Sequence, residues 1–257
     1  MRMYGEELFL KHRTKIGICL EHTRKAFVPC NFYLRNMFRE IGILIRKEFE
    51  LEMRNKVALS GVLLYVITTI FLCYLSFQSI EDQKVWNTLF WIILLFSAVN
   101  TISKSFFLET RGRLFYLYTI ASPAAVVLSK MIYNMLLMVS TAGITILFYA
   151  LFLGSKPIEG ANLGMYFTAL LLGASGFAGI FTLISAISAR TNNTMGIMAI
   201  LGFPLILPLL TTLILLSDVS LRGLTWEYGY REVMILGGIN VLVAALSYLL
   251  FPYLWRE

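Results

Sequence analysis

Six long stretches of this chain carry no charged side chain, and they constrain its fold more than any other feature. They cover residues 57–80, 85–103, 131–155, 160–189, 191–217 and 233–255. A helix needs about 20 apolar residues to cross the hydrocarbon core of a bilayer. No water is present there to satisfy backbone N–H and C=O groups, so such spanning segments are expected to be helical. The sequence therefore predicts an all-α integral membrane protein with six transmembrane helices.

The composition agrees with a membrane protein and excludes several other classes. Apolar residues make up 58% of the 257 residues and charged residues 14%, whereas soluble domains have about 25% charged residues. The net charge of +7 does not indicate a nucleic-acid partner, because the cations lie at the ends of the apolar stretches. The chain lacks phosphate-loop, zinc-protease and serine-hydrolase motifs, and both histidines, His12 and His22, precede the first apolar stretch. We therefore predict neither a catalytic site nor a metal site, and assign no cofactor-binding residues.

The distribution of Lys and Arg predicts the orientation of the chain. If the N-terminus lies in the cytoplasm, the cytoplasmic segments hold eighteen of these residues and the external loops hold four. Because cytoplasmic loops carry the excess of Lys and Arg, we expect both termini on the cytoplasmic side. The longest external loop, residues 218–232, carries Trp226, Tyr228 and Tyr230. These aromatic side chains fit either a belt at the lipid headgroups or a docking surface for a partner.

The residues before the first span divide into two parts. Residues 1–36 are polar and have no clear period, so we expect a disordered tail or an over-extended N-terminus, with Met37 as the natural start. In the following stretch, Phe38, Ile41, Ile45 and Phe49 recur at helical spacing among charged residues. This pattern predicts an amphipathic helix that lies in the membrane interface.

Residues 103–130 form a charged interruption between the second and third spans. The first half carries Lys104, Glu109, Arg111 and Arg113, and the second half, residues 114–129, has no charge. Sixteen residues are too few to cross a bilayer comfortably. We therefore predict a loop and an interfacial helix on the cytoplasmic face, with the third span beginning near Met131. A solvated loop with an aromatic cluster and a re-entrant hairpin limb are the alternatives.

The spans themselves contain packing signals and no ionisable side chain. The absence of such groups at membrane depth argues against an ion-coupled secondary transporter. In the fourth span, Ala174 and Ala178, and likewise Ser175 and Gly179, form small-xxx-small pairs. Such pairs allow close helix packing, and the same face could serve an oligomer.

The fifth span contains two prolines, Pro204 and Pro208. Each proline lacks the N–H that a helix interior needs, so the span should kink there. The kink is either static or a hinge used in transport.

Several stretches together resemble the haem exporter protein B family (CcmB-like). They are FFLE at 106–109, the residues 113–117, SPAAVVLSK at 122–130, GFPLILPLL at 202–210 and IRKEF at 45–49. The resemblance covers about residues 37–257 and supports Met37 as the start. It implies an ABC-2-type permease fold for residues 37–257, with a cytoplasmic coupling helix between spans two and three.

The resemblance also implies a function and a set of partners. Members of this family are membrane permease subunits of the cytochrome c maturation ABC transporter in the bacterial inner membrane. Implied partners are a separate cytoplasmic ATP-binding subunit, a haem-handling membrane protein and, indirectly, a periplasmic haem chaperone. Haem is implied as a transported or handled ligand. The residues expected to couple this chain to the ATP-binding subunit are Glu109, Arg111, Arg113, Leu114, Leu117 and Pro123.

Several alternatives stay open at this point. The subunit either passes haem itself or transmits ATP-driven motion that releases the loaded chaperone, as one copy or as a pair. The rival functions are an ABC-2 permease that exports a lipid, polysaccharide or drug, and a membrane scaffold that transports nothing. Deleting the gene would separate them, because only the haem-linked function predicts the loss of all c-type cytochromes.

Overall fold

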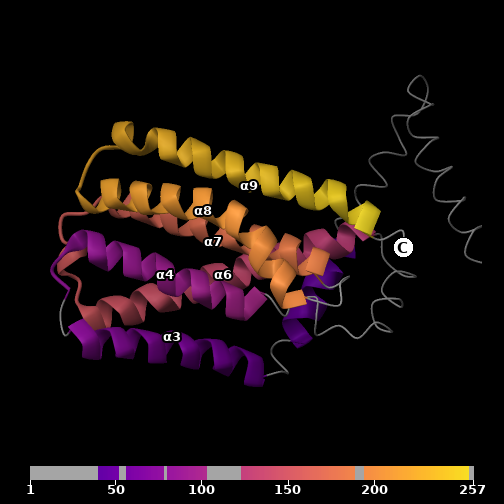
Figure 1. Cartoon of the computed structure of the whole chain (residues 1–257), viewed down its shortest axis with the longest axis horizontal. Helices are drawn as coiled ribbons and strands as arrows, with labels where there is room; N and C mark the ends of the chain where they lie inside the picture. The colour runs from indigo at the N-terminus through magenta and orange to yellow at the C-terminus, as the bar shows by residue number, and fades with distance from the viewer. Residues whose placement is uncertain (1–39, 52–55, 78–79, 103–122, 189–193, 255–257) are drawn as a thin grey trace, which may run out of the picture.

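The computed structural model describes residues 40–51, 56–77, 80–102, 123–188 and 194–254. Among these residues every regular element is a helix, joined to the next by short turns, and none is a strand (Figure 1). The long helices are α3 (Lys56–Phe77), α4 (Gln83–Ile102), α6 (Pro123–Leu153), α7 (Leu163–Ser188), α8 (Thr194–Leu221) and α9 (Trp226–Leu254). A 3-10 turn, η1 (Lys156–Ile158), follows α6, and residues 40–51 form a shorter helical segment. All six long helices are long and apolar enough to cross a membrane.

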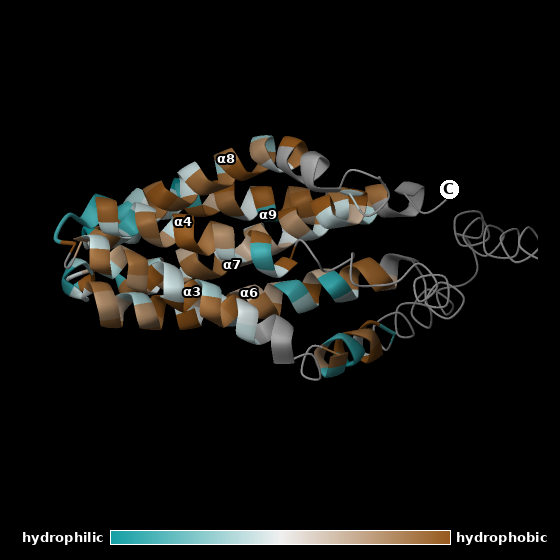
Figure 2. Cartoon of the chain, turned by 60° about the horizontal axis from the view of Figure 1, so that its bottom comes forward, coloured by the Kyte–Doolittle hydropathy of each residue, from teal (hydrophilic) through white to brown (hydrophobic). Residues whose placement is uncertain are grey.

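The long helices run side by side as one bundle with two distinct ends. Residues 80–82, 154–162 and 222–225 connect successive helices at one end, on the left of Figure 1, which we call the turn end. The segment 40–51 lies at the other end, which we call the opposite end, near the first residues of α6. Figure 2 shows apolar residues along the length of the helices and hydrophilic residues mainly at the two ends of the bundle. This distribution is the one expected for helices in lipid.

Helix α7 forms the centre of the bundle. Of the residues in its apolar span 78% are buried, compared with 11% in α3 and 17% in α9. Three glycines allow this central position, because side chains of neighbouring helices occupy the space beside them. An added Cβ would lie 2.7 Å from the Trp91 ring at Gly173, 2.7 Å from Leu209 Cδ1 at Gly176 and 3.1 Å from Val243 Cγ1 at Gly179.

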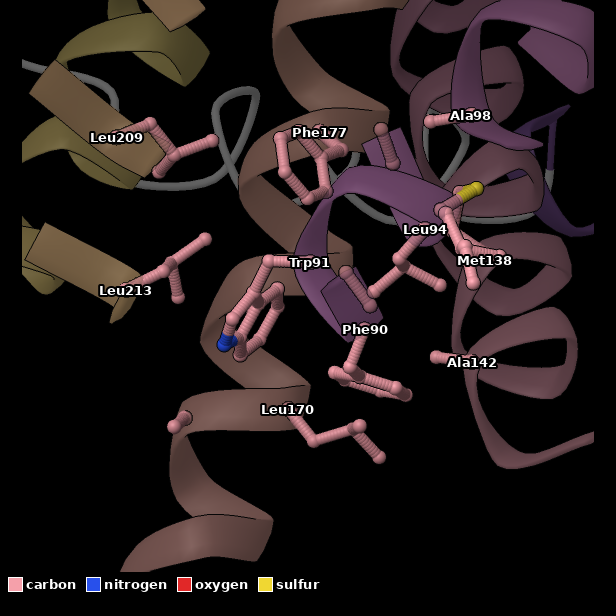
Figure 3. Close-up of a cluster of buried hydrophobic side chains, with 14 of the residues drawn as sticks. Phe90, Trp91, Leu94, Ala98, Met138, Ala142, Leu170, Phe177, Leu209 and Leu213 are labelled. Carbon is pink, nitrogen blue, oxygen red and sulfur yellow. The ribbon is translucent and has the colours of Figure 1, made fainter. Parts of the chain in front are cut away.

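Aromatic side chains of α4 fill the space between α6, α7 and α8. In Figure 3, Trp91 points between α7 and α8, and Phe90 lies beside it near Leu170. The Trp91 indole Nε1 donates a hydrogen bond to Ser217 Oγ at 2.8 Å. Tyr149 Oη donates to the Trp86 carbonyl oxygen at 2.9 Å. These buried polar atoms are therefore satisfied across helices, as stable packing in a dry interior requires.

At the turn end, the connection 154–162 is held to the last turn of α8 by hydrogen bonds. The Asn162 N–H donates to the Ser220 carbonyl at 2.9 Å, and Ser220 Oγ donates to the Asn162 carbonyl at 2.8 Å. Gly223 has a φ of 69°, and a Cβ there would lie 2.6 Å from the Gly160 carbonyl oxygen. Only glycine fits both the left-handed backbone and this close approach.

Two helices begin earlier than the charge-free stretches indicate. Helix α6 begins at Pro123, eight residues before Met131, so residues 123–129 are its first turns. A proline is tolerated there because the first N–H groups of a helix have no helical partner. Helix α9 begins at Trp226, and the long external loop is reduced to a turn at 222–225. Helix α8 continues through Asp218, which forms an ion pair with Arg222 at 2.8 Å.

Candidate functional site

The first turns of α6 form a packed contact with the helical segment 40–51. Ile41 and Leu44 from this segment and Ala125 and Val126 from α6 make one buried apolar cluster, separate from the main core. Ala125 is 0% exposed and Ile41 is 7% exposed. The cluster fixes the segment on the end of a transmembrane helix, at the opposite end of the bundle.

A buried ion pair lies beside this apolar cluster. Lys130 Nζ is 3.4 Å from Glu48 Oε1, and the Lys130 side chain is 2% exposed. Lys47 Nζ also approaches Glu48 Oε1, at 3.6 Å. A lysine is almost never fully buried unless it is paired, because taking the charge out of water costs several kcal/mol. The contact with Glu48 therefore helps a charged residue to lie inside the first turns of α6.

The other face of the segment 40–51 is exposed. Ile43 is 62% exposed and Phe49 57% exposed. Arg46 and Glu50 form an ion pair at 3.0 Å on this face, with side chains that are 82% and 61% exposed. The apolar face therefore differs from the predicted one: Leu44 is buried with Ile41, whereas Phe49 is exposed. The predicted face contained no carboxylate. The observed face contains Glu48, because positions 41, 44, 45 and 48 share one side of a helix.

A further polar contact joins α6 to α7 one turn beyond Lys130. Asn134 is 2% exposed, and its Nδ2 donates a hydrogen bond to Thr182 Oγ1 at 2.9 Å. Thr182 Oγ1 donates in turn to the Ala178 carbonyl of its own helix. Because Lys130 and Asn134 are four residues apart, they lie on the same face of α6. The ion pair and the amide contact therefore lie on one face of α6, one joining it to the segment 40–51 and the other to the central helix.

The residues predicted to contact an ATP-binding partner lie mostly outside the described residues. Glu109, Arg111, Arg113, Leu114 and Leu117 all fall in residues 103–122. Pro123, the last residue of that predicted set, is the first residue of α6. The predicted set therefore leads directly into the turns that carry Ala125, Val126 and Lys130.

The residues predicted to pack helices against one another lie on α7, which is the central helix of the bundle. Ala174 and Ala178 are 0% exposed. Gly179 lies against Met131 of α6 and Val243 of α9. Ser175 is half-buried, and its Oγ donates to the Leu172 carbonyl at 3.0 Å. The face that these residues form is occupied by helices of the same chain.

The two predicted kink residues lie within α8 and are exposed. Helix α8 continues from Thr194 to Leu221 through both Pro204 and Pro208. Thr212 Oγ1 donates to the Pro208 carbonyl at 2.7 Å. In Figure 1 the N-terminal half of the α8 ribbon turns away from α9, whereas the two helices lie side by side toward the turn end.

Sequence reasoning missed the roles of Glu48 and Lys130. The predicted apolar face of Phe38, Ile41, Ile45 and Phe49 leaves Glu48 among the charged residues around it, and a third span beginning near Met131 leaves Lys130 outside it. One available signal was the position of Glu48, seven residues after Ile41 and therefore on the same helical face. Among the described residues, no three His, Cys, Asp or Glu side chains gather as a metal site would require.

Comparison with known families gives one match. A family model described as CcmB protein matches residues 39–253, which is 215 of the 257 residues and includes all six long helices apart from the last residue of α9. Searches of the curated proteins and of the solved structures find no match.

Proposed function

Because the chain belongs to the CcmB family, the membrane subunits of a haem-export and cytochrome c maturation ABC transporter, we propose that it couples ATP hydrolysis by a cytoplasmic partner to export. The export step is either movement of haem or release of the haem-loaded periplasmic chaperone. The observation that carries this proposal is the family match over nearly the whole helical bundle. The chain is a permease subunit and not itself an enzyme, so hydrolysis belongs to a separate ATP-binding subunit.

The proposed orientation places the opposite end in the cytoplasm and the turn end in the periplasm. Eighteen of the 22 Lys and Arg residues then lie in segments at the cytoplasmic end. The excess of Lys and Arg on the cytoplasmic side is the usual determinant of orientation in a bacterial inner membrane. Both termini are cytoplasmic in this arrangement, and the segment 40–51 lies at the cytoplasmic membrane interface.

The proposed docking segment is Leu108–Ser122, a coupling helix that enters a cleft of the ATP-binding subunit. Arg111 and Arg113 would meet acidic groups of that subunit, with Glu109, Leu114, Leu117 and Pro123 completing the coupling set. Docking can drive motion only if the partner binds two arrangements of the spans with different affinity. The position of the segment supports this role, because its last residue directly precedes the first turn of α6.

We favour transmission of motion over passage of haem through the described part of the bundle. Trp86, Phe90, Trp91 and Phe177 are each 0% exposed and fill the interior between the helices. This filled interior suits a subunit that moves as a packed body, driven from its cytoplasmic end.

Reversing the charge of the docking segment tests the proposal. The double substitution Arg111→Glu with Arg113→Glu should lower co-purification of the ATP-binding subunit by about tenfold or more, since each close charge pair contributes about 1.5 kcal/mol or more. Cellular c-type cytochromes should fall in parallel. The matched control is Lys156→Glu, which reverses one charge at the turn end. Unchanged co-purification together with normal c-type cytochromes would refute the docking role.

A further inference from the structure

We infer that Lys130 and Glu48 are positioning residues that make the segment 40–51 and the first turns of α6 move as one unit when ATP is hydrolysed. The inference rests on the proposed function, because it concerns how motion that begins at the docking segment reaches the spans. Neither residue is expected to contact ATP or haem. Their role is to keep two cytoplasmic elements in one fixed arrangement.

Burial identifies Lys130 as the central residue of this unit. Its side chain is 2% exposed and lies 3.4 Å from Glu48, which is 16% exposed. By contrast, the ion pairs Arg46–Glu50 and Lys156–Glu81 have side chains that are more than 60% exposed. Exposed pairs contribute little, whereas a buried charge that loses its partner is strongly unfavourable. The arrangement with Lys130 against Glu48 is therefore held far more strictly than the exposed pairs.

Two separate contacts prevent the segment from rotating or sliding on α6. The apolar cluster of Ile41, Leu44, Ala125 and Val126 holds one turn. The ion pair holds the next turn, since Lys130 lies four and five residues beyond those α6 positions. With a single contact the segment could rotate about that point on α6. Two contacts on successive turns fix its orientation. The docking segment ends at residue 122, about two helical turns before Lys130.

The same face of α6 carries the connection into the bundle. Asn134, one turn after Lys130, donates to Thr182 of α7 at 2.9 Å. Helix α7 is the most buried of the six and contacts α4, α6, α8 and α9. A displacement of α6 at Lys130 is therefore passed to the central helix within one further turn.

The chemistry of the pair favours a positioning role over simple stabilisation. A buried ion pair often stabilises no more than apolar side chains of similar volume. What it adds is a requirement for one arrangement, as buried polar groups do when they fix register. A lysine and a glutamate at this contact therefore indicate that the two elements must be held in one arrangement, and not only held together.

The test compares neutral variants of the pair with a matched exposed pair on the same segment. Lys130→Met and Glu48→Gln remove one charge each, and the double variant Glu48→Lys with Lys130→Glu exchanges the charges. Arg46→Met and Glu50→Gln are the controls. Each full-length chain is purified with its ATP-binding subunit, and the amount of complex, its ATPase rate and the cellular c-type cytochromes are measured.

We expect Lys130→Met and Glu48→Gln to retain the complex and its ATPase activity while c-type cytochromes fall by about tenfold, the size of a typical coupling between sites. Charge exchange should restore most of the cytochrome content, because the interaction belongs to the pair and not to either residue. The control variants should behave like the wild type. Normal cytochromes in Lys130→Met, or a parallel loss of complex and cytochromes without recovery on exchange, would overturn the inference.

A second measurement tests the mechanical contact without any partner. Amide hydrogen exchange of residues 40–51 in the purified chain should be faster in Lys130→Met than in Arg46→Met by about tenfold, because local opening reports the loss of anchoring contacts. Equal exchange in the two variants would overturn the inference. If the wild-type chain binds no ATP-binding subunit, the proposed function fails, and hydrogen exchange still decides whether the pair anchors the segment.

Discussion

The two ends of the bundle are held together in different ways. At the turn end, the connection 154–162 is joined to α4 and α8 by hydrogen bonds to backbone groups. Asn162 pairs with Ser220, Trp86 Nε1 donates to the Gly154 carbonyl, and Gln83 Nε2 donates to the Pro157 carbonyl. At the opposite end, the described contacts of the segment 40–51 with α6 include one small apolar cluster and the Glu48–Lys130 ion pair.

This difference indicates which end can change shape. The hydrogen bonds that join α4 and α8 to residues 154–162 must break together before the turn end can open, so it should act as a fixed frame. Among the described residues, the contact between the segment 40–51 and α6 depends on few side chains, and a change in charge or in the position of α6 can alter it. An ATP-driven movement should therefore be largest at the opposite end and should fade toward the turn end.

The largest expected effect comes from removing the indole ring of Trp86, at the turn end. Trp86 is 0% exposed, and its ring packs edge-to-face against the ring of Tyr149. The two ring centroids are 4.9 Å apart. Trp86→Ala should lower the free energy of unfolding by about 3–5 kcal/mol, because a large buried cavity results. Denaturation of the purified chain in detergent measures this loss. Trp226→Ala is the control, since that side chain is 47% exposed at the same end. Similar stability of the two variants would mean that the turn end is not a packed frame.

An intermediate effect is expected at Gly223. Gly223→Ala places a Cβ 2.6 Å from the Gly160 carbonyl oxygen and forces a non-glycine residue to a φ of 69°. A strained conformation of this kind costs about 1–3 kcal/mol. Gly238→Ala is the control, because nothing lies within 4 Å of an added Cβ there. The same denaturation measurement applies, and a neutral Gly223→Ala would show that the turn tolerates rearrangement.

The smallest effect is expected at Asn134, toward the opposite end. Asn134→Leu removes the hydrogen bond to Thr182 and should cost about 0.6–2 kcal/mol, as polar contacts between membrane helices do. Asn100→Leu is the control, because Asn100 Nδ2 donates within its own helix, to the Phe96 carbonyl. If Asn134→Leu lowered the free energy of unfolding as much as Trp86→Ala, the opposite end would not be the less stable of the two.

The number and order of the spans followed from the sequence because charge and hydropathy determine them. What could not be derived is which face of each helix is buried. Helices α3 and α7 are similarly apolar, yet the buried share of their spans is 11% and 78%. Lipid and protein interior are equally suitable for Leu and Ile, so hydropathy does not distinguish the two environments. The small residues of α7, such as Gly173 and Gly176, carried the usable signal.

The ends of the helices were harder to predict because charged residues were taken as terminators. Helix α6 continues through Lys130 and α8 through Asp218, since each charge has a partner, Glu48 and Arg222 respectively. Glu48 lies 82 positions from Lys130 in the sequence, and no local pattern predicts such a contact. The candidate site therefore depended on tertiary structure, whereas the six spans did not.

The ATP-driven mechanism requires that the opposite end faces the cytoplasm and the turn end faces the periplasm. The most direct test is labelling of single cysteines in intact cells with a membrane-impermeant maleimide. Cys19, Cys30 and Cys73 are first replaced by serine, and Arg111→Cys and Lys156→Cys are then introduced separately. We expect position 156 to be labelled in intact cells and position 111 only after the membrane is permeabilised. Labelling of position 111 from outside intact cells would contradict the orientation and the ATP-driven mechanism built on it.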